Sequence, residues 1–449
     1  MKKVLFVSDS PVLNTGFGKV LRKIAVHMSR QYEVKVLGWF HTQSVVGRSV
    51  FPFDIVPTHP GGDDTYGEKT FPALVQAYKP DLVFCLGDSW MVKSMTEYPN
   101  RKFHLMLYCP VDGAPLPPGW VNVYSKANTF VAYLPWAKKV IEASGTKFPV
   151  HVIPHGIDTS VYRPHATGGE SPFPDNQFLV GCVARNQPRK QLPRLLKTYS
   201  AFLSQWTFCP GCGTNHLGQK LEKCPHCNST SLVYGDSKTD SLLYMHASNE
   251  DVGWNLQALA ERYNMKDFLI MPPNMEVGGG ISETELSDLY MHMDVFTLPT
   301  SGEGFGIPIM EAMACGVPTL VTNYSAHVDF CRDASDLINV SEFVTEPGSC
   351  VERALVDMTD YYMRLERMYY EHNVFWPKWG RYMMANFGVK DRDGKDVLCG
   401  VAYRKHLSEA GLKRVKEYTW EKIMPKWDEL FASILGKPEE KKGLQLEIV

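Results

Sequence analysis

The chain has 449 residues, of which 44% are hydrophobic and 21% are charged, values close to those of ordinary globular proteins. A single hydrophobic core usually stops growing below this length, so we expect two or three domains and take two lobes as the working number. The 47 Lys and Arg residues nearly balance the 49 Asp and Glu residues, which excludes a strong overall field toward nucleic acid or an anionic membrane.

The first residues, MKKVLFVSDS, resemble the start of a signal peptide only superficially. Their apolar run ends after Val7, which is too short for a secretory segment, and no stretch of about 18 apolar residues occurs anywhere. We therefore expect a buried first strand, a cytoplasmic location and no transmembrane segment.

The N-terminal part alternates short apolar runs with segments of helical periodicity. The runs are KVLFVSD, EVKVLGW, DLVFCLGD, HLMLYCP, TFVAYLP and VHVIPHG, and helices are expected near 18–31, 71–78 and 136–143. Continuously apolar strands separated by helices indicate a parallel sheet that is covered on both faces. Residues 1–165 are thus predicted to form one doubly wound, Rossmann-like lobe.

A polar segment rich in Pro and Gly follows, and the alternation then restarts. This linker lies near 165–176, and the later elements are FLVGCVAR, a helix near 192–205, SLLYMHA, DFLIMPP, DVFTLPT and VPTLVTN. The predicted fold is therefore α/β, with a second Rossmann-like lobe over 166–418 that faces the first across a cleft. Ligands of such sheets lie beyond the carboxyl ends of the strands.

Two carboxylates eight positions apart occur in the segment TLPTSGEGFGIPIMEAMACG. Glu303 is expected in a turn and Glu311 on the following helix, while Gly304 and Gly306 would let backbone amides approach a ligand closely. The free amides at the helix start suit a pyrophosphate, and the helix carboxylate can accept hydrogen bonds from ribose hydroxyls. The alternative is a strand, turn and helix with an incidental acidic cap.

Two cations follow the strand that opens the second lobe. Arg185 and Lys190 are five positions apart in VGCVARNQPRK, and their charges could stabilise a departing diphosphate in place of a metal ion. Considered alone, such a pair is more often a solvated surface.

The first lobe offers weaker signals. The segment NTGFGKV holds a lone Gly-x-Gly without the third glycine and the later acid of a dinucleotide site, so a nicotinamide oxidoreductase is disfavoured. Asp112 follows another strand among prolines, as either a sugar or acceptor contact or a plain Asx-turn.

These motifs resemble the Glu-x7-Glu family of retaining glycosyltransferases, which includes bacterial glycogen synthases, sucrose synthases and phosphatidylinositol mannosyltransferases. The resemblance implies the GT-B fold, with Glu303 facing the donor sugar and Glu311 contacting the ribose. The other donor contacts that it implies are Arg185 and Lys190 on the diphosphate, the amides of Gly304, Phe305 and Gly306, and the first-lobe residues Gly16, Phe17 and Gly18.

The resemblance covers most of the chain but has departures. Many relatives have a histidine near Asp112 and an asparagine at the position of His155, which we interpret as a hinge or turn residue. The apolar stripe over 419–436 resembles the family's last helix, which returns to the first lobe and clasps the two halves. The stretch near 370–400 lies outside the resemblance.

The function that the resemblance implies is transfer of a sugar, expected to be a hexose, from a UDP- or GDP-sugar to an unidentified acceptor hydroxyl, with retention of configuration. No catalytic metal is expected, and Asp391 and Asp393 are interpreted as surface residues. One alternative is a nucleotide-sugar-binding module that docks a nucleic acid or protein. Another is a glycosyltransferase acting on a modified nucleic acid base.

Eleven cysteines divide into seven scattered ones and four with paired spacing. The paired ones form two Cys-x2-Cys hooks, Cys209 with Cys212 and Cys224 with Cys227. Four thiolates can close tetrahedrally on one structural zinc ion, so we predict a zinc ribbon over 207–230, inserted in the second lobe. Lys220 and Lys223 supply little positive charge, which favours protein contact or stabilisation over nucleic acid binding as its role.

Overall fold

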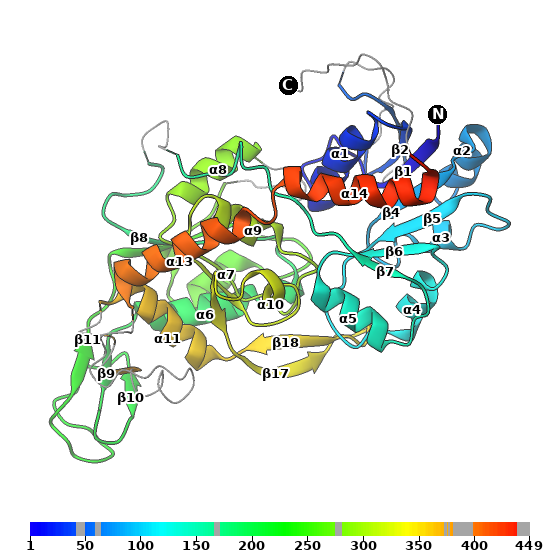
Figure 1. Ribbon diagram of the computed structural model, residues 1–449. Helices are drawn as coiled ribbons and strands as arrows, with labels where there is room; N and C mark the ends of the chain where they lie inside the picture. Colours follow the sequence, from blue (N-terminus) through cyan, green and yellow to red (C-terminus); the bar gives the residue numbers. More distant parts are fainter. Residues whose placement is uncertain are drawn as a thin grey trace.

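The computed structural model describes residues 1–41, 50–58, 64–165, 171–273, 281–371, 375, 378–379 and 398–437. They form two α/β lobes, each built on a parallel sheet, and a small antiparallel insertion that projects from the second lobe (Figure 1). The predicted fold class is confirmed.

The first lobe is a seven-stranded parallel sheet in the order β3-β2-β1-β4-β5-β6-β7. Its strands carry apolar side chains on both faces, and the helices between them cover those faces, as expected for a parallel sheet. The strands are β1 (Lys3–Asp9), β2 (Glu33–Trp39), β3 (Asp54–Pro57), β4 (Leu82–Leu86), β5 (His104–Tyr108), β6 (Thr129–Ala132) and β7 (Val150–Val152). The helices are α1 (Gly16–Met28), α2 (Thr70–Tyr78), α3 (Lys93–Thr96), α4 (Pro118–Tyr124) and α5 (Pro135–Ala143).

The second lobe has a six-stranded parallel sheet in the order β13-β12-β8-β14-β15-β16. The strands are β8 (Phe178–Val183), β12 (Ser241–His246), β13 (Leu269–Ile270), β14 (Val295–Leu298), β15 (Thr319–Thr322) and β16 (Asp336–Ile338). The helices are η1 (Pro188–Lys190), α6 (Leu192–Leu203), α7 (Leu256–Arg262), η2 (Lys266–Phe268), α8 (Glu283–Met291), α9 (Ile307–Ala314), α10 (His327–Phe330), α11 (Met358–Tyr369) and α13 (Gly400–Val415).

In each sheet the strand order reverses once, between β1 and β4 in the first lobe and between β8 and β14 in the second. A reversal leaves room for a ligand beyond the carboxyl ends of the two strands. The loops that follow these four strands therefore carry the side chains of most interest.

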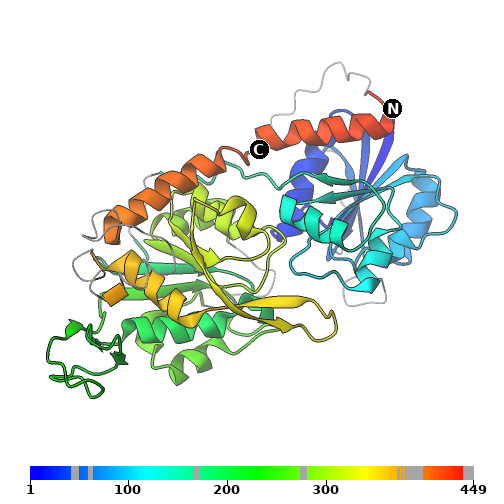
Figure 2. The ribbon, with the colours of Figure 1, turned by 60° about the horizontal axis from the view of Figure 1, so that its bottom comes forward.

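The chain passes between the lobes twice, and the two passages lie side by side. The Ile157 amide donates to the Tyr418 carbonyl (2.8 Å), just before helix α14 (Trp420–Leu435) begins. That helix lies across the first lobe (Figure 2), where Phe431 stacks on Phe6 and Trp427 packs edge-on against Tyr108. The last helix thus packs on the first lobe.

Two antiparallel pieces are added to the second lobe. The cysteine-rich insertion has the strand order β10-β9-β11, with β9 (Trp206–Phe208), β10 (Asn215–Leu217) and β11 (Val233–Gly235). A hairpin of β17 (Val340–Thr345) and β18 (Glu352–Val356) follows β16 and extends toward the first lobe (Figure 2). The sequence patterns did not predict this hairpin.

Candidate active site

Glu303 lies in the turn between β14 and α9, and two cations from η1, which follows β8, hold it. Lys190 Nζ and Arg189 Nη1 both donate to Glu303 Oε1, Arg189 at 2.8 Å. Arg189 Nη1 also donates to the Gly302 carbonyl (3.0 Å), and the Ser301 amide donates to the Arg189 carbonyl (2.6 Å). The two switch-point loops of the second lobe are therefore one connected unit.

Burial and charge act in opposite directions on these groups. Burial would raise the pKa of Glu303, but the charges of Arg189 and Lys190 outweigh it and hold that pKa well below its ordinary value. Burial, followed by the charge of Arg189, lowers the pKa of Lys190, and Glu303 opposes this shift. We interpret Glu303 as an ionised carboxylate at neutral pH.

Arg185, predicted to act beside Lys190, points to a different partner. Its side chain is 52% exposed and makes two hydrogen bonds with Asp251, from Nε to Oδ2 (2.7 Å) and from Nη2 to Oδ1 (3.1 Å). Burial raises the pKa of Asp9 in the first lobe, and the charge of Arg185 is close enough to oppose that shift. In this structure the cation beside Lys190 on Glu303 is Arg189, which the sequence reasoning missed.

Asp112 follows β5 of the first lobe and meets the second lobe directly. Arg353 on β18 contacts Asp112 at two atoms. Arg353 Nη1 lies 2.9 Å from Asp112 Oδ1 and also donates to the Asp112 carbonyl oxygen (3.1 Å). Arg189 Nε lies 4.0 Å from Asp112 Oδ2. Asp112 is therefore held by two second-lobe arginines, within reach of the unit that contains Glu303.

Two further aspartates follow first-lobe strands at the reversal of the sheet. Asp9 ends β1, and its Oδ2 accepts a hydrogen bond from the Thr15 hydroxyl (2.6 Å). Asp88 follows β4, and burial, followed by the charge of Asp112, raises its pKa to about 6. Both end an apolar run in the sequence, KVLFVSD and DLVFCLGD, and this signal could have identified them alongside Asp112.

Glu311 is buried on α9, and residues of both lobes contact its carboxylate. Its Oε2 accepts a hydrogen bond from the Tyr290 hydroxyl (3.0 Å), and Lys19 of α1 lies 3.5 Å from its Oε1. Lys19 also lies 3.4 Å from Glu283. A ligand hydroxyl at Glu311 would therefore meet a carboxylate that already has a first-lobe cation beside it.

The glycine segment of the first lobe begins a helix. Gly16, Phe17 and Gly18 form the first turn of α1, capped by Thr15. Close packing requires a glycine at position 18, since a Cβ there would lie 2.7 Å from the Leu13 carbonyl oxygen. A Cβ at Gly16 would lie 3.5 Å from Ile307 of the second lobe, so this turn still lies at the junction of the lobes.

The turn over Gly304, Phe305 and Gly306 packs tightly against the first lobe. A Cβ at Gly304 would lie 2.6 Å from Pro110, and Gly306 has a φ of +94°, which favours glycine. Phe305 is buried with its ring 4.8 Å from that of His155, and His155 Nδ1 lies 2.8 Å from the Tyr108 hydroxyl, so His155 lies between the lobes among aromatic rings. This position is compatible with a hinge contact.

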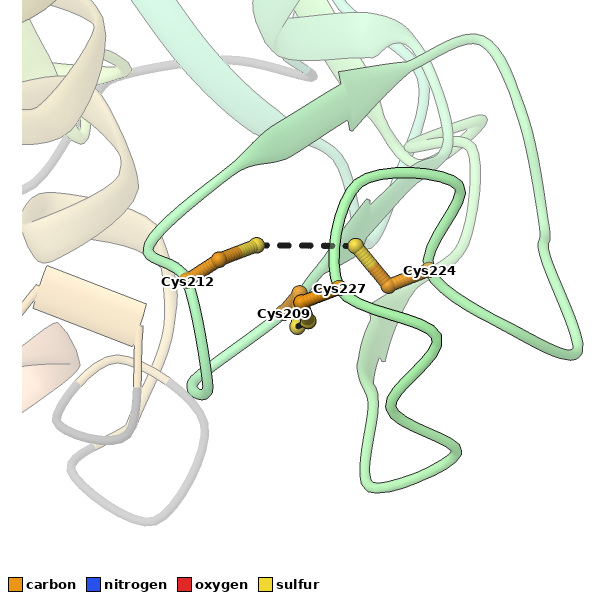
Figure 3. A group of neighbouring side chains, drawn as sticks. All are labelled: Cys209, Cys212, Cys224 and Cys227. Atoms are coloured by element: carbon orange, nitrogen blue, oxygen red, sulfur yellow. Dashed lines mark hydrogen bonds between the residues drawn. The ribbon is translucent and has the colours of Figure 1, made fainter.

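The four paired cysteines converge in the insertion (Figure 3). Their Sγ atoms all lie within 4.8 Å of one another, with Cys209 3.4 Å from Cys227 and Cys212 3.5 Å from Cys224. A tetrahedral zinc site with bonds of about 2.3 Å needs sulfur atoms about 3.8 Å apart. The cluster therefore fits one such ion.

Asp391 and Asp393, which we interpreted as surface residues, lie outside the described residues. In the described residues, none of the helices is both long enough and apolar enough to cross a bilayer.

Comparisons with solved structures define the fold. A sucrose-phosphate synthase from Thermosynechococcus elongatus superposes with a TM-score of 0.66 at 14% identity, covering 97% of this chain and 99% of that one. The Anabaena protein HepE, solved in complex with UDP and glucose, gives 0.57 at 14% identity, covering 96% and 100%. The chain has the two-lobed GT-B fold.

Residues 253–359, which include Glu303 and Glu311, match the family model described as glycosyl transferases group 1. An O-antigen chain mannosyltransferase B from Escherichia coli is 33% identical over 19% of this chain and 20% of its own length. A phosphatidyl-myo-inositol mannosyltransferase from Propionibacterium freudenreichii is 31% identical over 24% of this chain and 26% of its own length. The chain thus matches about a fifth to a quarter of these two relatives.

The chain thus has the GT-B fold, and residues 253–359 of its second lobe are similar to the group 1 glycosyltransferases. The second lobe also carries a four-cysteine cluster that could bind zinc.

Proposed function

We propose that the protein is a retaining glycosyltransferase that moves a hexose from a nucleoside diphosphate sugar to an acceptor hydroxyl. The observation that carries the proposal is the pair of cations, Arg189 and Lys190, on the Glu303 turn at the start of α9. Departure of a diphosphate places negative charge where these cations and the helix amides can stabilise it. No metal ion is then required for that charge.

In the proposed reaction the donor lies between the lobes. Glu303 and Asp112 contact the sugar, Glu311 the ribose, and Lys190 and Arg185 the diphosphate. Arg189 adds its charge from the Glu303 turn. The amides of Gly304, Phe305 and Gly306 contribute on the second-lobe side, and Gly16, Phe17 and Gly18 on the first-lobe side.

The bond between the anomeric carbon and the diphosphate oxygen breaks as the acceptor oxygen attacks the same face. The acceptor's proton passes to the released phosphate oxygen, so no separate base is needed, and the configuration is retained. Retention and the hexose rest on the family resemblance. The mannosyltransferases among the relatives and the UDP and glucose bound to HepE agree with a UDP- or GDP-hexose donor.

Donor hydrolysis tests this proposal without knowledge of the acceptor. Purified protein is incubated with UDP-glucose and with GDP-mannose in the presence of EDTA, and free sugar and its first-formed anomer are followed by NMR. We expect slow hydrolysis of one donor with retained configuration, and Glu303→Gln should reduce its rate by about 10²- to 10³-fold.

Glu285→Gln is the matched control, because Glu285 caps α8 on the surface and should leave the rate unchanged. A Glu303→Gln rate equal to that of the wild type would contradict the assigned chemistry. Complete loss in EDTA that added magnesium restores would contradict metal independence.

We also propose that the four-cysteine cluster holds one structural zinc ion, since four thiolates leave no open position for catalysis. Trp206, buried on β9, reports on the insertion. We expect one zinc per chain by elemental analysis, its loss in Cys212→Ser, and a changed Trp206 environment in that variant. Retained zinc in Cys212→Ser would overturn this assignment.

A further inference from the structure

The β17–β18 hairpin places a second-lobe arginine on a first-lobe carboxylate. Arg353 is buried, with 6% of its surface exposed, and its Nη1 donates to both the carbonyl oxygen and Oδ1 of Asp112. Its Nη2 donates to Glu346 Oε2 (2.9 Å) within the hairpin. The guanidinium is therefore fixed from its own lobe and presents its other end to Asp112.

Backbone contacts hold the hairpin against the same first-lobe loop. The Glu352 amide donates to the Ala114 carbonyl (3.2 Å), and the Ala114 amide donates to the Tyr324 hydroxyl (3.2 Å). That hydroxyl in turn donates to the Glu352 carbonyl (3.2 Å). The Asp112 loop is thus joined to the second lobe at Ala114 as well as at Asp112.

The approach of the two lobes at this point leaves no space for side chains. A Cβ at Gly302 would lie 1.9 Å from the Asp112 carbonyl oxygen, and a Cβ at Gly113 would lie 2.1 Å from Val351. Gly302 directly precedes Glu303. The position of Asp112 is consequently set relative to the Glu303 turn, and not only by its own sheet.

Both cations beside Asp112, Arg353 and Arg189, come from the second lobe. If the lobes separate, Asp112 loses the contacts with both arginines at once. It is then held only by its own proline-rich loop. We infer that Arg353 is a positioning residue for sugar transfer, which fixes Asp112 against the donor sugar only while the lobes are closed. This inference rests on the proposed function, because it assumes that Asp112 contacts the sugar.

The kinetic test compares Arg353→Ala and Arg353→Lys with wild type in donor hydrolysis. A misplaced contact at the reacting centre lowers turnover by about 10²-fold, so we expect this loss of kcat in Arg353→Ala. Binding of UDP alone, measured by thermal shift, should be unchanged because it does not involve Asp112. Arg353→Lys should recover only part of kcat, since one ammonium group cannot reproduce the forked contact.

Two controls separate positioning from a general loosening of the junction. Glu346→Gln removes the charge of the residue that fixes Arg353 inside the hairpin but keeps an acceptor oxygen there, so it should lower kcat much less than Arg353→Ala. Asp329→Asn weakens a different contact between the lobes, in which Asp329 Oδ2 accepts from the Trp136 amide (2.7 Å). If Asp329→Asn lowers kcat as much as Arg353→Ala, the specific role of Arg353 is refuted.

A double-mutant cycle gives a readout that does not depend on turnover. Arg353→Ala, Asp112→Ala and the double variant are compared by thermal unfolding, and coupled residues in direct contact should show non-additive shifts. Additive shifts would overturn the inference even if no donor is hydrolysed. Coupled shifts with an inactive wild type would instead place the failure in the proposed function.

Discussion

The two lobes share one architecture, but the loops that follow their strands carry opposite charges. In the first lobe, β1, β4 and β5 are followed by the acids Asp9, Asp88 and Asp112. In the second lobe, β8 is followed by the cations Arg185, Arg189 and Lys190. The second lobe also has two acids in such loops, Glu303, which Arg189 and Lys190 hold, and Asp251, which pairs with Arg185.

This difference shows how one fold can divide two tasks. A doubly wound sheet only brings strand ends to one edge, and the residues placed there decide which ligand charge is favoured. A diphosphate suits the cationic edge. The acidic edge suits a neutral sugar and an acceptor hydroxyl, and it also supplies counter-charges to the second-lobe arginines.

The largest effect is expected from removing one cation at a time from the second-lobe edge. Lys190→Met should lower kcat for donor hydrolysis by about 10²-fold or more, because this buried charge acts directly on the Glu303 turn. Arg185→Met should mainly weaken donor binding and raise KM, because its side chain is half exposed and paired with Asp251. Steady-state kinetics of both variants measure the contrast.

Asp251→Asn is the control for Arg185, since it removes the observed partner and leaves both predicted diphosphate cations. If Lys190→Met and Arg185→Met change kcat and KM alike, the two cations are equivalent and the structural distinction between them fails.

Much of this arrangement follows from local sequence patterns. Continuous apolar runs with helices between them predict two parallel sheets, because a strand buried on both faces admits few polar residues. The spacing of the four cysteines predicts their convergence, since two hooks meeting at one point is a local requirement for a tetrahedral site. These features depend on near neighbours in the chain.

The contacts between the lobes could not be predicted in the same way. Arg189 was overlooked because only the spacing of Arg185 and Lys190 matched the family resemblance. Arg353 lies on a hairpin in which β17 is mostly exposed and β18 mostly buried, and neither strand shows a clear alternation. Its pairing with Asp112, 241 positions away, depends on how two separately folded lobes meet.

A smaller effect should come from the acidic edge. Burial, together with Asp112, raises the pKa of Asp88 to about 6, so the folded protein holds a proton that the unfolded chain has released. Stability is therefore lost as pH rises from about 4 to 6. Asp88→Asn should be more stable than wild type at pH 7 by about 1–2 kcal/mol, a gain that disappears near pH 4.

Denaturant unfolding across this pH range measures that gain, with the exposed Asp175→Asn as the control. If the unfolding free energies of wild type and Asp88→Asn differ by the same amount at all pH values, burial of Asp88 beside Asp112 does not destabilise the folded protein in the proposed way.

The smallest effect concerns the uncharged part of the junction, where His155 packs between Tyr133 and Phe305. Burial lowers the pKa of His155 to about 3, so below its ordinary value of 6.5 the unfolded chain binds a proton that the folded protein does not. Stability should then fall as pH drops from 6.5 toward 3, by at most about 1.4 kcal/mol per pH unit from this residue.

His155→Asn lacks this titration, so its stability relative to wild type should improve steadily on acidification, while the exposed His406→Asn should follow wild type. Urea unfolding at pH 7.5, 6.5 and 5.5 tests the point, and parallel curves for wild type and His155→Asn would mean that this histidine takes up its proton without opening the junction.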